Sequence, residues 1–113
     1  MGQIPRGRRI TTRREILSLL GGRRVRGEAL ELFWRPATED RPRGTCITPK
    51  FGHTAVQRNR LRRRLKELMR ASVLANPLAR DYLVRARPAA YELDFKGLEA
   101  ALIELVEDIG EQP

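Results

Sequence analysis

The sequence predicts a single α+β domain, an α-β sandwich whose elements follow the order α-β-β-α-β-α. Three segments repeat apolar residues at steps of three or four, which is helical spacing. Three shorter segments carry the alternation or the β-branched and aromatic residues typical of strands. The expected helices are residues 11–20, 54–73 and 95–109, and the expected strands are residues 28–35, 43–48 and 81–87. A chain of 113 residues is long enough for one modest core, so we expect one domain over residues 11–113.

The N-terminal segment combines a basic arm with a short helix. Residues 1–10 contain Gly, Pro and Arg with few apolar residues, so we expect a mobile basic arm. A Thr-Thr pair can cap the helix that follows, and Ile16, Leu19 and Leu20 fall on one of its faces. A Gly-Gly pair then ends this helix.

The next part of the chain predicts a hairpin. Residues 23–27 are expected to form a basic turn before the first strand. Leu30, Leu32 and Trp34 share one side of that strand and Phe33 faces the other, which indicates a strand covered on both faces. A polar loop rich in turn residues separates it from the return strand.

The central helix is the most informative element. Thr54 can cap its start, and Leu61, Leu65 and Leu68 form one narrow apolar stripe. The polar remainder is strongly cationic, with Glu67 as its one acid. The polar residues that we expect to contact a polyanion are Arg58, Asn59, Arg60, Arg62, Arg63, Arg64, Lys66 and Arg70. Stacked cations without acid partners repel one another, and guanidinium groups match phosphate oxygens in pairs, so this pattern predicts a nucleic-acid-binding helix.

The charge of the chain is unevenly distributed. The formal net charge is +9, yet residues 1–90 hold 22 Lys or Arg against 7 Asp or Glu, whereas residues 91–113 hold 1 against 7. Asp94 can cap the last helix, whose acidic side chains lie largely off its apolar stripe. We therefore expect the basic body to face a polyanion and the last helix to point away from it.

The basic helix carries a specific resemblance. Its Arg-Asn-Arg triplet, a spacer, two further cations and a basic-acid pair resemble the signature of the protein subunit of bacterial ribonuclease P. An Ala-Val pair before the triplet and a lysine in the preceding Pro-Lys-Phe-Gly segment also fit that family. The matching residues are Lys50, Ala55, Val56, Arg58, Asn59, Arg60, Arg62, Arg63, Lys66 and Glu67. The resemblance extends over residues 9–109, mostly in layout.

Membership of that family would imply a non-catalytic RNA-binding subunit. The expected partners are the ribonuclease P RNA, which carries out catalysis with Mg²⁺, and precursor tRNA, whose 5′ leader is removed in the cytoplasm. By the same resemblance, the candidates for leader contact are Lys50, Ile16, Leu20 and Arg87. The family usually has phenylalanines in its first helix, where this chain has Ile16 and Leu20. The family also implies a left-handed crossover between the second and third expected strands, against the general preference for right-handed ones.

Catalytic chemistry is not expected from the chain itself. His53 is the single histidine, and nothing in the sequence places a serine or cysteine nucleophile beside it. A lone Cys46 and one histidine are too few for a zinc site, and we expect no metal site or catalytic residue on the protein. The sequence therefore predicts binding rather than reaction chemistry.

Two alternatives remain open from the sequence. A general RNA-binding or ribosome-associated basic protein would carry similar charge, whereas a DNA-reading helix would be expected to need a partner helix or a dimerising segment, so we expect no DNA partner. A membrane-surface helix would need its leucines for lipid, but the core requires them. The chain has no run of 18 apolar residues, and we expect no membrane partner.

Overall fold

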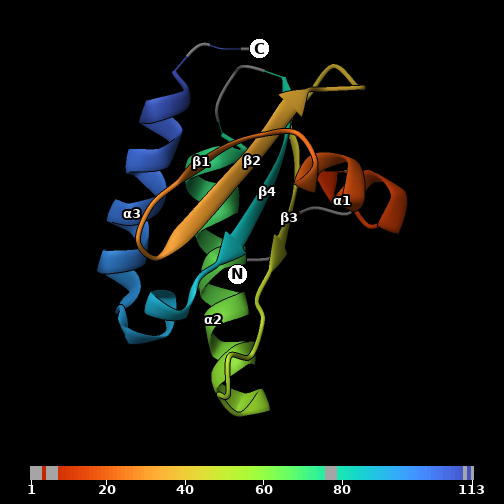
Figure 1. The fold of residues 1–113 in the computed structure, drawn as a ribbon. Helices are drawn as coiled ribbons and strands as arrows, with labels where there is room; N and C mark the ends of the chain where they lie inside the picture. The colour runs from red at the N-terminus through yellow and green to blue at the C-terminus, as the bar shows by residue number, and fades with distance from the viewer. Residues whose placement is uncertain (1–3, 5–7, 76–78, 111, 113) are drawn as a thin grey trace.

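The computed structural model describes residue 4 and residues 8–75, 79–110 and 112. Its strands form one four-stranded sheet of order β1-β2-β4-β3, and its helices pack around this sheet (Figure 1). The elements are α1 (Arg13–Leu20), β1 (Arg23–Arg26), β2 (Leu30–Pro36), β3 (Arg43–Ile47), α2 (Ala55–Leu68), β4 (Arg80–Ala86) and α3 (Phe95–Ile109). A π-helical turn (Met69–Val73) continues α2, and a 3₁₀ helix (Pro88–Glu92) follows β4.

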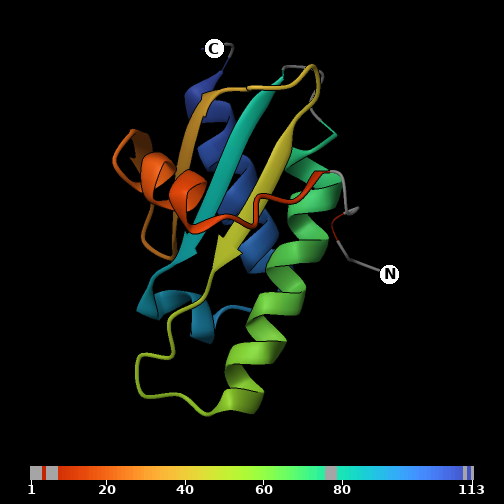
Figure 2. The same cartoon turned by 90° about the vertical axis from the view of Figure 1, so that its right-hand side faces the viewer.

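The connection from β3 through α2 to β4 is left-handed. β3 and β4 are parallel neighbours, with Thr45 opposite Leu83. In Figure 1 both strands run downward, β4 lies to the left of β3, and α2 returns behind the sheet, while Figure 2 confirms that α2 and α1 lie on opposite faces. This hand is the rare one for parallel strands and agrees with the expectation drawn from the family resemblance.

Helices cover both faces of the sheet. On one face, the leucine stripes of α2 and α3 pack against Leu30, Leu32 and Trp34 of β2 in the larger core. On the other face, α1 covers Phe33 and Leu83 in a smaller core. This layering confirms the predicted α-β sandwich, and it leaves the polar side of α2 facing outward.

The sheet contains one strand that the sequence pattern did not predict. The expected basic turn at residues 23–27 is wrong, because Arg23–Arg26 forms β1, an edge strand antiparallel to β2. Val25 is half-buried, whereas the arginines on either side are exposed. The Arg23 guanidinium lies 5.2 Å from the centre of the Trp34 ring. Long arginine side chains can cover apolar surface while their charged ends stay in water, so a strand forms with little apolar sequence.

The basic arm expected over residues 1–10 falls partly outside the described residues. Within the described part, Ile4 and Ile10 are buried, and Arg9 forms a parallel bridge with Gly44 of β3. Arg8 also donates through Nε to the carbonyl of Pro42 at 3.0 Å. These residues therefore lie against the domain rather than extending from it.

Candidate nucleic-acid interface

A capping box fixes the start of α2. The Oγ1 of Thr54 accepts a hydrogen bond from the Gln57 backbone N–H at 3.2 Å, and Gln57 Oε1 accepts one from the Thr54 N–H at 2.8 Å. The two bonds satisfy backbone donors that a helix otherwise leaves unpaired at its N-terminus. The burial of Leu61, Leu65 and Leu68 fixes which side of α2 faces solvent.

The outward side of α2 gathers the cations that the sequence singled out. The exposed members are Asn59, Arg60, Arg62, Arg63 and Arg70, and the half-buried members are Arg58, Arg64 and Lys66. Glu67 pairs with Arg70 at 2.7 Å. Across the described residues, Arg70 is the one cation of α2 and its π-helical turn that forms an ion pair. We call these eight residues the α2 cationic face, and among the described residues its cations other than Arg70 have no acid partner.

Two hollows on or beside the α2 cationic face are lined by both Arg62 and Lys66. A shallow one of about 420 Å³ is lined by Asn59, Arg62, Arg63 and Lys66. It contains guanidinium and ammonium donors together with one amide, and no carboxylate lines it. Such a surface suits phosphate oxygens, with Asn59 able to donate or accept a further hydrogen bond.

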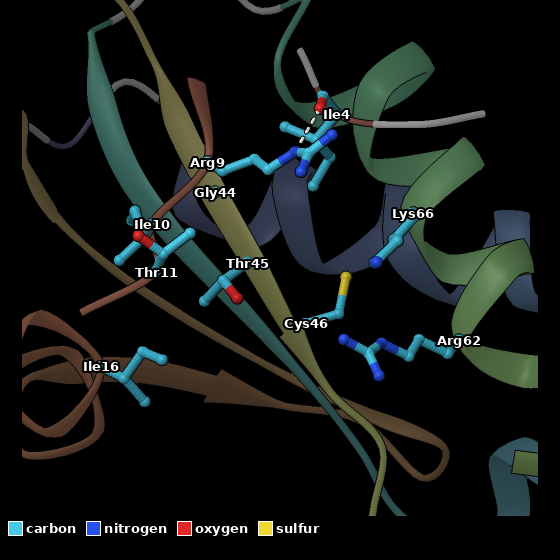
Figure 3. A pocket seen from close by; sticks show the side chains of 10 residues that line it. All are labelled: Ile4, Arg9, Ile10, Thr11, Ile16, Gly44, Thr45, Cys46, Arg62 and Lys66. Atoms are coloured by element: carbon cyan, nitrogen blue, oxygen red, sulfur yellow. Dashed lines mark hydrogen bonds between the residues drawn. The ribbon is translucent and has the colours of Figure 1, made fainter. Parts of the chain in front are cut away.

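The second hollow, of about 340 Å³, lies between α2, β3 and the N-terminal segment (Figure 3). Arg9, Arg62 and Lys66 line it. Burial, together with the charges of Arg62 and Arg9, lowers the pKa of Lys66 below its ordinary value. The thiol of Cys46 lies at the same hollow, and burial raises its pKa to about 12 although Lys66 and Arg62 oppose the shift. Cys46 is therefore a neutral packing residue at pH 7, not a nucleophile.

The four candidates for leader contact occupy different environments. Lys50 is exposed on the loop after β3. Arg87 follows β4 at the same end of the sheet, but its Nη1 donates to the Gly27 carbonyl at 2.6 Å. Ile16 and Leu20 are half-buried and pack against the smaller core beneath α1. Ile16 and Leu20 are therefore engaged in core packing, whereas the exposed Lys50 can reach a ligand.

A second group of cations lies on the sheet face that carries α1. Arg24 and Arg26 of β1 and Arg85 of β4 surround the buried carboxylate of Glu31, at 3.5, 3.0 and 3.0 Å. We call these four residues the Glu31 cluster. Burial opposes ionisation of Glu31, but hydrogen bonds from Arg85 and Arg26 outweigh it and lower the pKa of the carboxyl. Three cations against one acid leave this area positive.

The sequence reasoning missed the Glu31 cluster as a site. One signal was present, since arginines two positions apart, at 24 and 26, must share a face if that segment is a strand. The expectation of a turn at residues 23–27 removed that inference. The convergence on Glu31 depends on the pairing of β1, β2 and β4, which a single sequence does not supply.

Neither a metal-binding group nor a membrane-spanning helix is found among the described residues. No three His, Cys, Asp or Glu side chains among them come together as a metal-binding group. Within the same residues, no helix is long and apolar enough to cross a membrane. That these surfaces bind an anion stays a prediction from the charge pattern.

Curated relatives resemble this chain along three quarters or more of its length. The Ribonuclease P protein component of Xylella fastidiosa (strain 9a5c) is 31% identical over 112 residues, which cover 98% of this chain and 82% of the relative. That of Acidothermus cellulolyticus (strain ATCC 43068 / DSM 8971 / 11B) is 35% identical over 88 residues, covering 75% and 72%.

Solved structures share the fold. The RNase P protein from Staphylococcus aureus superposes with a TM-score of 0.82 at 20% identity, covering 91% of this chain and 95% of that one. The RNase P protein from Thermotoga maritima gives a TM-score of 0.78 at 24% identity, covering 89% and 96%. The family model described as Ribonuclease P matches residues 4–110. The motif on α2, the fold and these matches together place the chain in the Ribonuclease P protein family.

Proposed function

We propose that this chain is the protein component of a ribonuclease P ribonucleoprotein in the cytoplasm, where it binds the catalytic RNA and the 5′ leader of precursor tRNA. Its role is to assist endonucleolytic removal of the leader during tRNA maturation. The observation that carries the proposal is the α2 cationic face, which is held outward by buried leucines and, among the described residues, has Glu67 at Arg70 as its one acid partner.

Electrostatics gives the α2 cationic face its function in this proposal. Catalytic RNA and substrate are both polyanions, so bringing them together costs repulsion. Each phosphate that Lys or Arg neutralises releases a condensed counterion, which makes binding strong at low salt and weaker as salt rises. The fixed start of α2 at Thr54 holds the cations in one arrangement, and so favours one register on the RNA.

The leader is proposed to lie on the sheet face beyond α1. The Glu31 cluster supplies positive charge there, and Lys50 adds an exposed cation on the loop after β3. Arg87 is proposed to contribute through its charge, since its Nη1 is already bonded to the Gly27 carbonyl. Ile16 and Leu20 contribute only through their exposed edges, because both pack on the smaller core. Leader contact is thus assigned mainly to cations rather than to α1.

Mg²⁺ is assigned to the RNA in this proposal. The reaction is hydrolysis of one phosphodiester that leaves a 5′-phosphate on the tRNA, and it needs divalent cations at the RNA. The described acids of the protein do not gather into a ligand set, so these residues do not fit a resident metal. The protein is expected to lower the Mg²⁺ requirement by screening phosphate repulsion.

Reconstitution tests this function. The protein is combined with a bacterial ribonuclease P RNA and a precursor tRNA with a 5′ leader, at an Mg²⁺ concentration where the RNA alone is slow. The expected result is faster cleavage at the mature 5′ end, reduced in the Arg62→Ala/Arg63→Ala variant and kept in Lys96→Ala, a cation exposed on α3. Binding of the RNA without any gain in cleavage would leave a general RNA-binding protein as the better description.

A further inference from the structure

Three aromatic side chains meet at the N-terminal end of α2. The His53 ring stacks on the Tyr91 ring with centres 3.9 Å apart and planes 6° apart. Phe51 meets Tyr91 edge to face, with ring centres 6.5 Å apart and planes at 88°. The Tyr91 hydroxyl donates to the Pro49 carbonyl at 2.5 Å, which joins the 3₁₀ helix after β4 to the loop before α2. These contacts therefore fix the aromatic group between the two segments.

Phe51 is held outward in a strained conformation. The turn over residues 50–53 is closed by a hydrogen bond from the His53 N–H to the Lys50 carbonyl at 2.8 Å. Its two central residues have positive φ, 86° at Gly52 and 47° at Phe51. Glycine adopts this conformation freely, whereas a bulky side chain rarely does. Phe51 nevertheless occupies the turn and is 47% exposed, an arrangement that burial in the core does not explain.

Cations lie next to the aromatic group. A hollow of about 110 Å³ is lined by His53, Gln57, Arg60, Arg64 and Tyr91 together with Leu61, Ala90 and Leu93, and no carboxylate lines it. Lys50 directly precedes Phe51 and is exposed. Phe51 does not line this hollow, but its exposed ring meets the edge of Tyr91, which does. An exposed ring close to a cationic surface suits a single-stranded nucleotide, with the ring stacking on the base and the cations binding its phosphates.

We propose that Phe51, supported by the His53–Tyr91 stack, is a stacking platform for one unpaired RNA base, whose flanking phosphates lie against Arg60, Arg64 and Lys50. This inference rests on the RNA-binding function proposed above and adds a base contact to its phosphate contacts. Stacking tolerates any base, so the platform selects unpaired nucleotides over paired ones rather than one sequence over another.

The test uses the full chain and RNA carrying 2-aminopurine, a base whose fluorescence falls when it stacks. The first arm titrates protein into a short single-stranded RNA with one internal 2-aminopurine. Wild-type protein is expected to quench it, and Phe51→Leu, which keeps an apolar side chain without a π-face, to bind ~5-fold or more weakly with little quenching. Phe51→Trp is expected to retain both. Phe95→Ala, at an exposed phenylalanine on α3, is the matched control and should behave as wild type.

The second arm measures the affinity of the same variants for intact ribonuclease P RNA without substrate. A loss by Phe51→Leu in the first arm alone assigns the base to single-stranded RNA such as a leader, and a loss in the second arm assigns it to the catalytic RNA. Equal affinity and equal quenching for wild type and Phe51→Leu in both arms overturn the platform. Wild-type protein that quenches the short RNA yet fails in reconstitution overturns the proposed function and leaves the platform standing.

Discussion

The Glu31 carboxylate accepts a hydrogen bond from the Nε of Arg85 at 3.0 Å, which ties β2 to β4 on the sheet face that carries α1. Arg26 Nε donates to the other oxygen of the same carboxylate at 3.0 Å, and Arg24 lies 3.5 Å from it. One buried acid therefore holds together three arginines that would otherwise repel one another. The cluster stabilises the β1 edge and concentrates positive charge there.

Glu31→Gln is expected to lower the free energy of unfolding at pH 7 by about 1.5–3 kcal/mol, the range for hydrogen bonds to a charged group. In the wild type, burial opposes ionisation of Glu31, but the bonds from Arg85 and Arg26 prevail and lower its pKa below the ordinary value of 4.5. A lowered pKa contributes stability that is present above pH 4.5 and lost as pH falls through the folded-state pKa. Urea unfolding measured from pH 7 to pH 3 checks both the loss at pH 7 and the loss of stability in acid.

Glu28→Gln is the matched control for the Glu31 prediction. Glu28 is exposed and precedes β2, so its removal should leave the acid-dependent loss of stability as in the wild type. The Glu31→Gln variant should lose less stability than the wild type over the same pH range. An identical pH profile for the two variants would show that Glu31 does not carry the acid sensitivity.

Asp81→Asn is expected to destabilise the fold by about 3–5 kcal/mol. Asp81 is fully buried and accepts from Arg35 Nε at 2.9 Å and from Arg43 Nε and Nη2 at 3.2 and 3.1 Å. The hydrogen bond to Asp81 is also the main reason that the pKa of Arg43 is raised. The asparagine would remove the negative partner of Arg35, and would leave Arg43 only its partners outside the core, Glu15 at 3.1 Å and Glu39 at 3.6 Å. Denaturant unfolding gives the loss directly.

Asp40→Asn provides the comparison for Asp81, because Asp40 is exposed in the loop between β2 and β3. Its effect should stay within about 0.5 kcal/mol, as for surface substitutions generally. Equal unfolding midpoints for the two variants would remove Asp81 from the structural role assigned to it.

Periodicity was sufficient to predict most of the fold. The leucine stripe of α2 and the apolar stripe of α3 are real core faces, since Leu61, Leu65 and Leu98 are all buried. Alternation in β2 correctly placed Phe33 and Trp34 on opposite faces. These predictions succeeded because burial of one face repeats at the period of the element itself.

The parts of the structure that the sequence did not predict depend on pairing between segments far apart in the chain. β1 has one apolar residue, Val25, so its sequence shows no alternation of apolar and polar residues. The strand forms because it pairs with β2. The left-handed crossover likewise came from the family resemblance, because local sequence carries no handedness. Within the candidate site, the motif predicted the α2 cationic face, whereas the Glu31 cluster required the strand register.

Thr54→Ala is expected to lower the free energy of unfolding by about 1 kcal/mol, the usual loss for removing an N-cap side chain. The alanine removes the acceptor at 3.2 Å from the Gln57 N–H and breaks the capping box. Thr54→Ser keeps a hydroxyl and should remain within a few tenths of a kcal/mol of the wild type. Thermal unfolding of the three proteins measures this difference, and matching melting temperatures for alanine and threonine would rule out the cap as a stabilising contact.

Replacing Arg62 and Arg63 by alanine is expected to weaken binding to ribonuclease P RNA and to flatten its salt dependence. Both side chains are exposed on the α2 cationic face and line the hollow with Asn59 and Lys66. The plot of log K against log salt should lose about 0.7–0.9 in slope for each phosphate contact removed. Alanine is the best helix former, so the helix itself should persist, and circular dichroism can verify this.

The salt-slope measurement separates direct contact from steering. A cation that only attracts RNA from a distance changes the association rate, whereas a cation at a phosphate changes the slope of the equilibrium constant with salt. Lys96→Ala removes one exposed positive charge from α3, a different helix from the one that carries the α2 cationic face, and should leave the slope unchanged. If the double variant also kept the wild-type slope, Arg62 and Arg63 would not touch the RNA, and the contact surface would have to be sought at the Glu31 cluster instead.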